Sequence, residues 1–349
     1  MGSKMIRSND PIVEFLNSVE SIQFRNNIKS SLKLFNHICK KNVFELKIDD
    51  IVDYQEDLND LRLNPLTNKP LCLSSKRVKL DHVKKFVKFL LKHYKDKYEQ
   101  GDRLEFKYDL KDKNYFTWKE DQPEPNTAFK REVMTKEELK AILTYLNDEK
   151  PVKYLMFRIL AESGMRKGEV LSIDMERNVE GKIIPIEEDL KNRFLRVRGK
   201  KGLMKYFISK ELSEQLLYYL HNVRDKRVQK YSSNTKALFI SQKGNRFHPS
   251  VLNQCLLGTM KRGEYRRDKT WGVLRKLNIE RHITPQTFRR TLNTHRKNKG
   301  CPTEEREVLI NHKSKSVNIN FYSITDDQQF RELFDTWNPY DELFHDLKY

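Results

Sequence analysis

The sequence predicts a mainly α-helical protein with a small antiparallel sheet, in which a helical front domain precedes a mixed domain. Three patterns support this fold class. Apolar residues recur at helical spacing through residues 10–97, and a capping box at Thr135–Glu138 begins a second helical stretch. Two short apolar runs also flank a Gly-Lys-Lys-Gly turn at residues 199–202. A chain of 349 residues is long enough for two or three domains.

The front of the chain, residues 1–108, is predicted to be a small helical domain. Residues 28–38 and 83–94 place apolar side chains every three or four positions, which is typical of helices that pack on a core. The second of these helices also carries lysines beside its apolar positions, among them Lys84 and Lys88. These lysines indicate either a solvated face or a DNA-binding surface, and the sequence favours neither.

An interdomain linker is expected at residues 109–134. The chain loses its periodicity from residue 101 onward and becomes rich in Asp, Asn and Pro. The second domain, residues 135–349, then begins with the capping box. Its expected elements are two strands at 194–197 and 205–208 and helices at 211–231, 249–260 and 286–299.

The charge of the chain indicates a polyanionic partner. Lys and Arg total 68 against 49 Asp and Glu, which gives a formal net charge of +19. The excess lies mainly in the second domain, where residues 251–300 hold many basic residues and only Glu264, Asp268 and Glu280 as acids. Nucleic acid is therefore the first partner to consider, ahead of a merely solvated basic face.

Cysteine spacing and hydropathy exclude several classes of protein. The 4 cysteines are scattered without a C-x-x-C pair, which argues against a disulfide framework or a zinc site and fits a reducing cytoplasm. The chain lacks an apolar run near the roughly 18 residues that span a bilayer. We therefore expect neither a metal nor a membrane partner.

Several polar motifs in the second domain carry the candidate chemistry. Arg166 follows Gly164, where one helix is expected to end and another to begin, so its guanidinium can be fixed toward a ligand. Arg289 and Arg290 fall one or two turns inside a helix that starts at Thr284-Pro285. Further along the chain, a histidine precedes a tyrosine by ten residues, at His312 and Tyr322.

In their order and spacing these motifs resemble the tyrosine recombinases, also called lambda-integrase-like or Xer-like enzymes. The resemblance extends from about Thr135 to Tyr322, while the front domain is similar to the core-binding domain of that family only loosely. The matching features are Gly-Met-Arg-x-x-Glu at 164–169, the hairpin Gly-Lys at 199–200, Thr-Pro-x-x-Phe-Arg-Arg-Thr at 284–291, His312 and Tyr322.

The resemblance implies a DNA-breaking and rejoining enzyme that needs no metal and no cofactor. Arg166 and Arg289 would clamp the non-bridging oxygens of the scissile phosphate, because planar guanidinium groups bind such oxygens bidentately. Tyr322 would attack phosphorus to form a 3′-phosphotyrosyl bond and release a 5′-hydroxyl, which permits resealing without ATP. Lys200 would protonate the leaving 5′-oxygen, with Lys201 as the competitor for this role.

The remaining candidate residues have supporting roles under the same resemblance. Glu169 would hold Arg166 in register, and His312 would bind the phosphate and assist deprotonation of the tyrosine. Gln286 departs from the family, which more often has His or Lys there; an amide can donate a hydrogen bond but cannot transfer a proton. Further DNA contacts are expected from Lys84, Lys88, Lys201 and Arg290.

The family resemblance also implies partners and a biological role. We expect a homotetramer on double-stranded DNA that carries a specific recombination site, located in the cytoplasm with the nucleoid. Integration and excision of a mobile element is the first expectation. Chromosome-dimer resolution, a type IB topoisomerase and a catalytically inactive DNA-binding regulator remain alternatives. The apolar tail 326–349 suits docking either on a neighbouring subunit or on its own domain.

Overall fold

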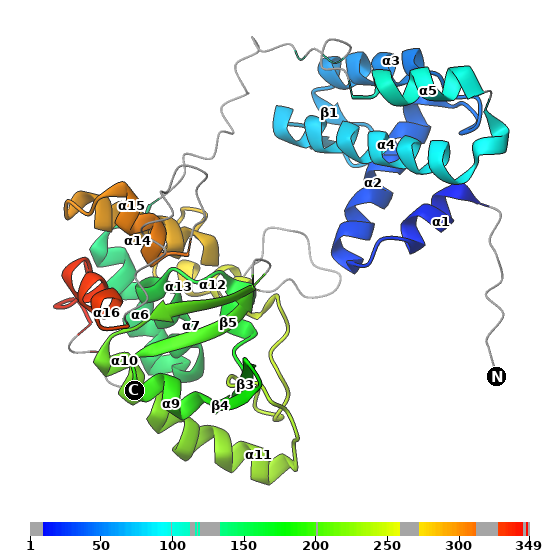
Figure 1. The fold of residues 1–349 in the computed structure, drawn as a ribbon. Helices are drawn as coiled ribbons and strands as arrows, with labels where there is room; N and C mark the ends of the chain where they lie inside the picture. Colours follow the sequence, from blue (N-terminus) through cyan, green and yellow to red (C-terminus); the bar gives the residue numbers. More distant parts are fainter. Residues whose placement is uncertain are drawn as a thin grey trace. The chain divides into compact units, whose positions relative to one another are not determined.

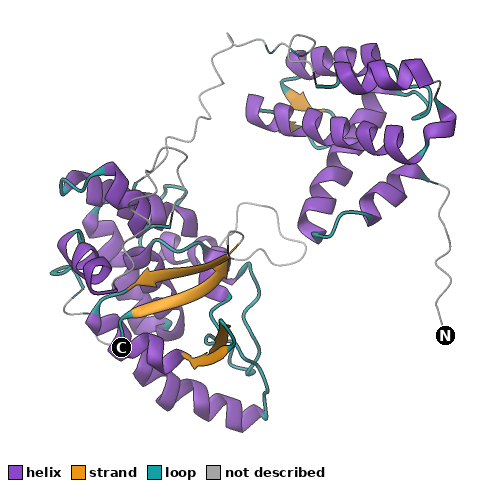
Figure 2. Cartoon of the chain, in the orientation of Figure 1, coloured by secondary structure: helices purple, strands orange, loops and turns teal. Residues whose placement is uncertain are grey.

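The computed structural model describes residues 10–98, 100–111, 116, 118, 133–199, 202–258, 272–311, 327–344 and 347. The chain divides into two compact units, Met1–Ala128 and Phe129–Tyr349 (Figure 1). Helices dominate both units, and the strands form short antiparallel pairs (Figure 2). The predicted fold class, mainly α with a small antiparallel sheet, is confirmed.

The first unit is a helical cluster that also contains a short strand pair. Helices α2 and α4 pack on each other, and α3 packs on both. The apolar positions that predicted these helices, such as Leu32, Phe86 and Leu90, are buried in one core. The elements are α1 (Pro11–Asn17), α2 (Ile22–Cys39), α3 (Ile48–Asp60), β1 (Leu63–Asn64), β2 (Lys69–Pro70), α4 (Leu73–His93), a 3-10 turn (Lys95–Lys97) and α5 (Gln100–Asp109).

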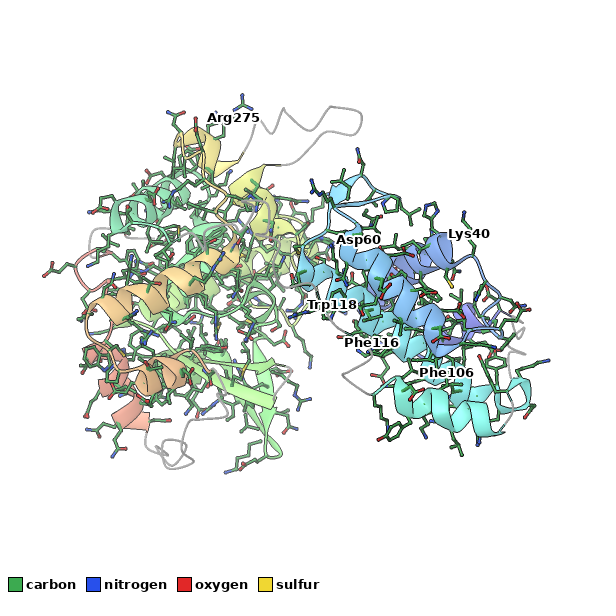
Figure 3. The ribbon with its side chains drawn as sticks, turned by 90° about the horizontal axis from the view of Figure 1, so that it is seen from above. Lys40, Asp60, Phe106, Phe116, Trp118 and Arg275 are labelled. Carbon is green, nitrogen blue, oxygen red and sulfur yellow. The ribbon has the colours of Figure 1, made fainter. Side chains whose placement is uncertain are left out.

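The core of the first unit continues beyond residue 108. Helix α5 occupies a stretch in which the sequence showed no sustained periodicity. Leu110 and Phe116, which the sequence analysis assigned to the linker, are buried in the core of this unit, and Trp118 packs against it (Figure 3). Lone aromatic residues without a helical period gave no sign of this packing, because it depends on contacts with distant helices.

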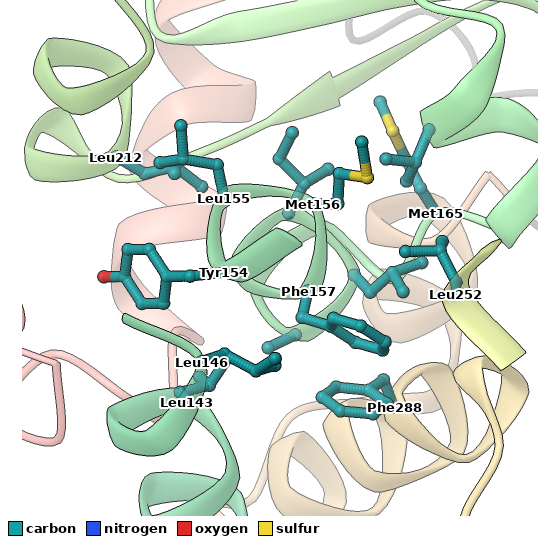
Figure 4. Close-up of a cluster of buried hydrophobic side chains, with 14 of the residues drawn as sticks. Leu143, Leu146, Tyr154, Leu155, Met156, Phe157, Met165, Leu212, Leu252 and Phe288 are labelled. Carbon is teal, nitrogen blue, oxygen red and sulfur yellow. The ribbon is translucent and has the colours of Figure 1, made fainter. Parts of the chain in front are cut away.

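The second unit is built around helix α7, which is buried on nearly all sides. Figure 4 shows Leu155, Met156 and Phe157 of α7 pointing in different directions into the surrounding side chains. Phe157 meets Phe288 of α14 with ring centroids 5.1 Å apart. The helices are α6 (Lys136–Glu149), α7 (Pro151–Ser163), α8 (Lys167–Leu171), α9 (Ile186–Lys191), α10 (Lys210–Tyr219), a π-helical turn (Leu220–Arg224), α11 (Asp225–Tyr231), α12 (Val251–Leu257), α13 (Val273–Lys276), α14 (Pro285–Asn298), α15 (Thr303–Leu309) and α16 (Asp327–Thr336).

Local sequence signals fix the start of this unit. The Thr135 hydroxyl accepts a hydrogen bond from the backbone N–H of Glu138 at 3.2 Å. The Glu138 carboxylate in turn accepts from the backbone N–H of Thr135 at 2.9 Å. The predicted capping box at the beginning of α6 is therefore confirmed.

The described part of the second unit contains two hairpins. The expected one pairs β5 (Phe194–Gly199) with β6 (Gly202–Phe207) in a register that sets Phe194 opposite Phe207 and Gly199 opposite Gly202. The other pairs β3 (Glu176–Val179) with β4 (Lys182–Pro185), and the sequence analysis missed it. Buried and exposed positions do not alternate regularly along these two strands. The sequence therefore lacks the two-residue period that would have predicted them.

The hairpin β5–β6 separates two apolar clusters. Leu195, Val197 and Tyr206 face the main core of the unit. Phe194 and Phe207 instead form a smaller cluster with α16, to which Phe334 contributes. This arrangement follows from the alternation of side chains along a strand.

The described part of the C-terminal tail packs on its own unit. Tyr340, Phe344 and Leu347 are buried in the main core. The Tyr154 hydroxyl also donates to the backbone oxygen of Leu347 at 3.0 Å. Of the two alternatives left open by the sequence, this chain therefore shows docking on its own domain.

Within the described residues, the helices are too short or too polar to cross a membrane. The same residues contain no group of three or more His, Cys, Asp or Glu side chains arranged to hold a metal ion.

Candidate active site

Gly164 creates the turn that presents Arg166. Helix α7 ends at Gly164 in the left-handed conformation, with φ at 67°. A Cβ atom there would lie 3.2 Å from the side chains of both Leu292 and Ile310. Glycine is therefore required both by the backbone conformation and by the close approach of α14. Arg166 follows as the residue that caps the N-terminus of α8.

Glu169 holds Arg166 at two points. Its Oε2 accepts the backbone N–H of Arg166 at 2.7 Å, and its Oε1 accepts from Arg166 Nη1 at 2.8 Å. The Glu169 side chain is 10% exposed, whereas the Arg166 side chain is 47% exposed. The carboxylate thus fixes one side of the guanidinium and leaves the rest of it accessible to a ligand.

Tyr206 of β6 completes this arrangement from the hairpin. Its hydroxyl donates to Glu169 Oε2 at 2.9 Å. Burial, together with the neighbouring Glu169 carboxylate, raises the pKa of Tyr206 well above its ordinary value. The phenol therefore stays protonated and remains a hydrogen-bond donor to the carboxylate.

Arg289 is a buried arginine on α14, 5% exposed. Its Nη1 donates to the backbone oxygen of Gly164 at 2.6 Å, and its Nη2 donates to that of Ile310 at 2.7 Å. Burial lowers the pKa of Arg289, and the nearby Arg166 lowers it further. A guanidinium has five N–H donors, so the contacts with the two carbonyls and with the Tyr206 side chain leave others for an anion.

A pocket of about 860 Å³ lies at this site. It brings together Arg166, Glu169 and Gln286, three of the residues that the sequence singled out. Arg289 lies beside it, bound to the Gly164 turn from which Arg166 emerges. The full lining is Arg166, Lys167, Gly168, Glu169, Ser172, Arg198, Met204, Asn253, Thr284, Pro285, Gln286 and Asn311.

Four of the predicted site residues, Lys200, Lys201, His312 and Tyr322, lie outside the described residues. Of their described neighbours in the chain, Asn311 lines the pocket, while Gly199 ends β5 and Gly202 begins β6. The roles expected for these four residues stay predictions.

The other predicted DNA contacts differ in their surroundings. Lys88 is exposed on α4, but the Lys84 ammonium lies 3.0 Å from the centroid of the Phe116 ring. Burial lowers the pKa of Lys84 to about 8. In the second unit, Arg290 is half-buried and donates to the Thr287 hydroxyl at 3.4 Å.

Sequence reasoning missed Tyr206 and Asn311. Both join chain segments that are far apart: Tyr206 bonds Glu169, and Asn311 Nδ2 donates to the backbone oxygen of Lys205 at 2.7 Å. One signal could have found Tyr206, because a tyrosine on the inward face of a strand needs a partner for its hydroxyl. Asn311 gave no such signal.

Comparison with known proteins identifies the class. Residues 132–329 match the model of the phage integrase family. Since this match covers more than half of the chain, the chain belongs to the phage integrase family. The predicted resemblance to the tyrosine recombinases is therefore confirmed at the level of the family.

Among curated proteins, the tyrosine recombinase XerD of Staphylococcus epidermidis is 23% identical over 185 residues, which are 53% of this chain and 54% of that protein. The XerD protein of a second strain of the same species matches equally well. The chain thus spans about half the length of the curated relatives it matches.

Solved structures of recombinases match most of the chain. XerH site-specific recombinase bound to palindromic difH substrate, in a post-cleavage complex, has a TM-score of 0.52 and 15% identity, with 95% of this chain and 85% of that chain covered. The Tn1549 transposon integrase in complex with transposon right end DNA has a TM-score of 0.49 and 13% identity, with 93% and 97% covered.

Proposed function

We propose that this chain is a site-specific recombinase that cleaves and rejoins duplex DNA through a 3′-phosphotyrosyl bond to Tyr322. The observation that carries the proposal is the Arg166 guanidinium, held by Glu169 at the pocket and accompanied by the buried Arg289. Two fixed guanidinium groups supply the positive charge that a phosphoryl transfer requires on its equatorial oxygens. Both arginines lie within the family match.

In the proposed step one bond to phosphorus forms, one breaks, and two protons move. The Tyr322 phenolic oxygen attacks phosphorus and loses its proton, with His312 as the assisting base, while the bond from phosphorus to the 5′-oxygen breaks. Lys200, or Lys201 in its place, gives a proton to that leaving oxygen. Gln286 is exposed at the pocket and donates an amide hydrogen bond to a phosphate oxygen. Neither a metal nor a cofactor takes part.

Duplex DNA is the proposed partner. The net charge of +19 supports binding through phosphate neutralisation, so affinity should fall steeply with salt. Lys84, Lys88, Lys201 and Arg290 are the proposed contacts outside the catalytic set. The XerH recombinase that shares the fold is bound to its difH substrate, which supports the same kind of partner for this chain. We also propose that a tetramer assembles on a specific DNA site.

Integration and excision of a mobile element is the biological role that we favour. Gln286, in a position where the family more often has His or Lys, is the feature that supports a divergent enzyme carried by such an element. Chromosome-dimer resolution is the second candidate, because the curated relatives are XerD recombinases. Relaxation of supercoils without a site would instead indicate a type IB topoisomerase.

Covalent capture tests the proposal. The probe is a pool of nicked duplexes with randomised arms. When such a duplex is cleaved, the fragment beyond the nick diffuses away, so the covalent adduct cannot be resealed. The wild-type chain should form adducts that resist denaturant, and sequencing the captured DNA should reveal one site. A chain that binds DNA without any adduct is the inactive regulator, which contradicts the proposal.

A further inference from the structure

Lys205 of β6 contacts both described residues that adjoin segment 312–326. Asn311 Nδ2 donates to the backbone oxygen of Lys205 at 2.7 Å. The Lys205 ammonium forms an ion pair with the carboxylate of Asp327. These contacts cross 106 and 122 positions of the sequence, yet they meet at one residue. The segment between Asn311 and Asp327 contains His312 and Tyr322.

Lys205 is itself held in place by the hairpin. It pairs with Arg196 across the two strands, and its ammonium lies 4.4 Å from the centroid of the Phe194 ring. Its side chain is 30% exposed, compared with 47% for Asp327. The ammonium therefore has a restricted position between the ring and the carboxylate, unlike a lysine that extends freely into water.

Helix α16 is anchored on the same face of the hairpin. The ring of Phe330 stacks on that of Phe207, with centroids 5.0 Å apart and an interplanar angle of 20°. Arg193 also donates to both carboxylate oxygens of Asp335. The Lys205–Asp327 pair lies at the N-terminal end of α16, which is the end next to segment 312–326.

The next residue of β6 points the other way. Tyr206 faces the main core and donates to Glu169, which holds Arg166. Two consecutive residues of one strand thus connect the phosphate-binding arginine and both flanks of the nucleophile segment. The same strand begins at the turn that carries Lys200.

We propose that Lys205 is a positioning residue, which sets the nucleophile segment relative to Arg166 by holding Asn311 and Asp327 against β6. This inference rests on the proposed function, in which Tyr322 is the nucleophile. An ion pair with this exposure contributes little to folding stability. Reaction rate is far more sensitive to geometry, because a small misplacement of reacting groups slows a step by orders of magnitude. The effect of Lys205 should therefore appear in the rate.

The experiment compares Lys205→Gln, Asp327→Asn, the double variant and Lys205→Arg. The matched control is Lys236→Gln, which removes another exposed lysine–carboxylate pair of the same unit, Lys236 with Glu176 at 2.7 Å. Single-turnover covalent capture is measured on the duplex selected from the randomised pool, with the chain in excess. Binding affinity and the unfolding midpoint are measured alongside.

Removing either partner of the pair should slow capture about tenfold, with binding and unfolding as in the control. The double variant should be no slower than the single ones, because both act through one contact. Lys205→Arg keeps the charge and should retain most of the rate. Equal capture rates in Lys205→Gln, Asp327→Asn and the control would overturn the inference, and so would a double variant in which the two losses add.

Hydrogen exchange tests the role of Lys205 independently of the proposed function. Peptides covering residues 308–330 should exchange faster in Lys205→Gln than in wild type and in Lys236→Gln, whether or not the chain cleaves DNA. Unchanged exchange there would overturn the role of Lys205 even if wild type captured no DNA. A wild type that fails to capture any duplex, but shows the expected exchange, would refute the proposed function alone.

Discussion

The hydroxyl of Tyr206 bonds the same carboxylate oxygen of Glu169 that accepts the backbone N–H of Arg166, at 2.9 and 2.7 Å. This oxygen joins the hairpin β5–β6 to the turn between α7 and α8. The other oxygen of Glu169 is left for the guanidinium of Arg166. Tyr206 therefore orients the carboxylate that orients the arginine.

Tyr206→Phe should slow covalent capture because it removes only this hydroxyl. We expect a loss of about threefold to tenfold in rate and of about 1 kcal/mol in stability, the usual contribution of one hydrogen bond. Single-turnover capture and urea unfolding measure the two effects. The control is Tyr219→Phe, since Tyr219 is also buried but bonds the backbone of Leu238 and Ile240. Equal capture rates in the two variants would contradict the role of Tyr206.

Gln286 should be tolerant of histidine but not of alanine. Imidazole keeps a hydrogen-bond donor and adds the capacity to carry charge, so Gln286→His should match or exceed the parent. Gln286→Ala loses the donor and should slow single-turnover cleavage about threefold to tenfold. If Gln286→Ala cleaved as fast as the parent, Gln286 would have no part in the reaction despite lining the pocket.

A sulfur-substituted substrate distinguishes the role of the lysine from that of the arginines. When sulfur replaces the bridging 5′-oxygen, the leaving thiolate needs no proton, so Lys200→Ala should regain about 10²-fold or more of its lost rate. Arg289→Ala should not be rescued, because the equatorial oxygens are unchanged. Rescue of Lys201→Ala instead would move the role by one residue, and rescue of neither would remove it from the hairpin.

Stability of the first unit should fall in mild acid because of His82. This residue is 4% exposed and lies 2.8 Å from the Ser31 hydroxyl through Nδ1. Burial lowers its pKa below 6.5, and the neighbouring Lys85 lowers it further. The unfolded chain thus binds the proton first, so the stabilising contribution is complete above pH 6.5 and is lost as pH falls through the folded pKa.

Denaturant midpoints at several pH values check this linkage. The midpoint of wild type should fall as the pH is lowered, and His82→Gln should show a weaker dependence over the same range. His295, whose pKa burial also lowers, lies in the second unit and should give that unit the same dependence in both proteins. An identical pH dependence in wild type and His82→Gln would contradict the assignment.

Local features of the fold could be predicted from the sequence, and long-range ones could not. The capping box at Thr135–Glu138 and the hairpin over 194–208 depend on neighbours in the chain, so their patterns were sufficient. The burial of Phe116 and the contact of Tyr206 with Glu169 depend on distant segments that meet only in the folded state. The spacing of apolar residues along the sequence gives no information about such long-range contacts.

The same difference between local and long-range features applies to the candidate site. Arg166, Arg289 and Gln286 were found because their motifs resemble a known family in order and spacing. The carbonyl contacts that hold Arg289, at Gly164 and Ile310, link residues 125 and 21 positions apart, and no local pattern indicates them. The sequence therefore indicated the candidate site residues more readily than the residues that hold them in place.

Mass spectrometry of the trapped adduct tests the central claim most directly. Digestion with trypsin yields a peptide from Ser316 to Arg331, in which Tyr322 is the only tyrosine. After nuclease treatment, this peptide should carry a nucleotide through its 3′-phosphate, and Tyr322→Phe should form no adduct while binding DNA normally. A nucleotide on a different residue, or an adduct that persists in Tyr322→Phe, would contradict the account.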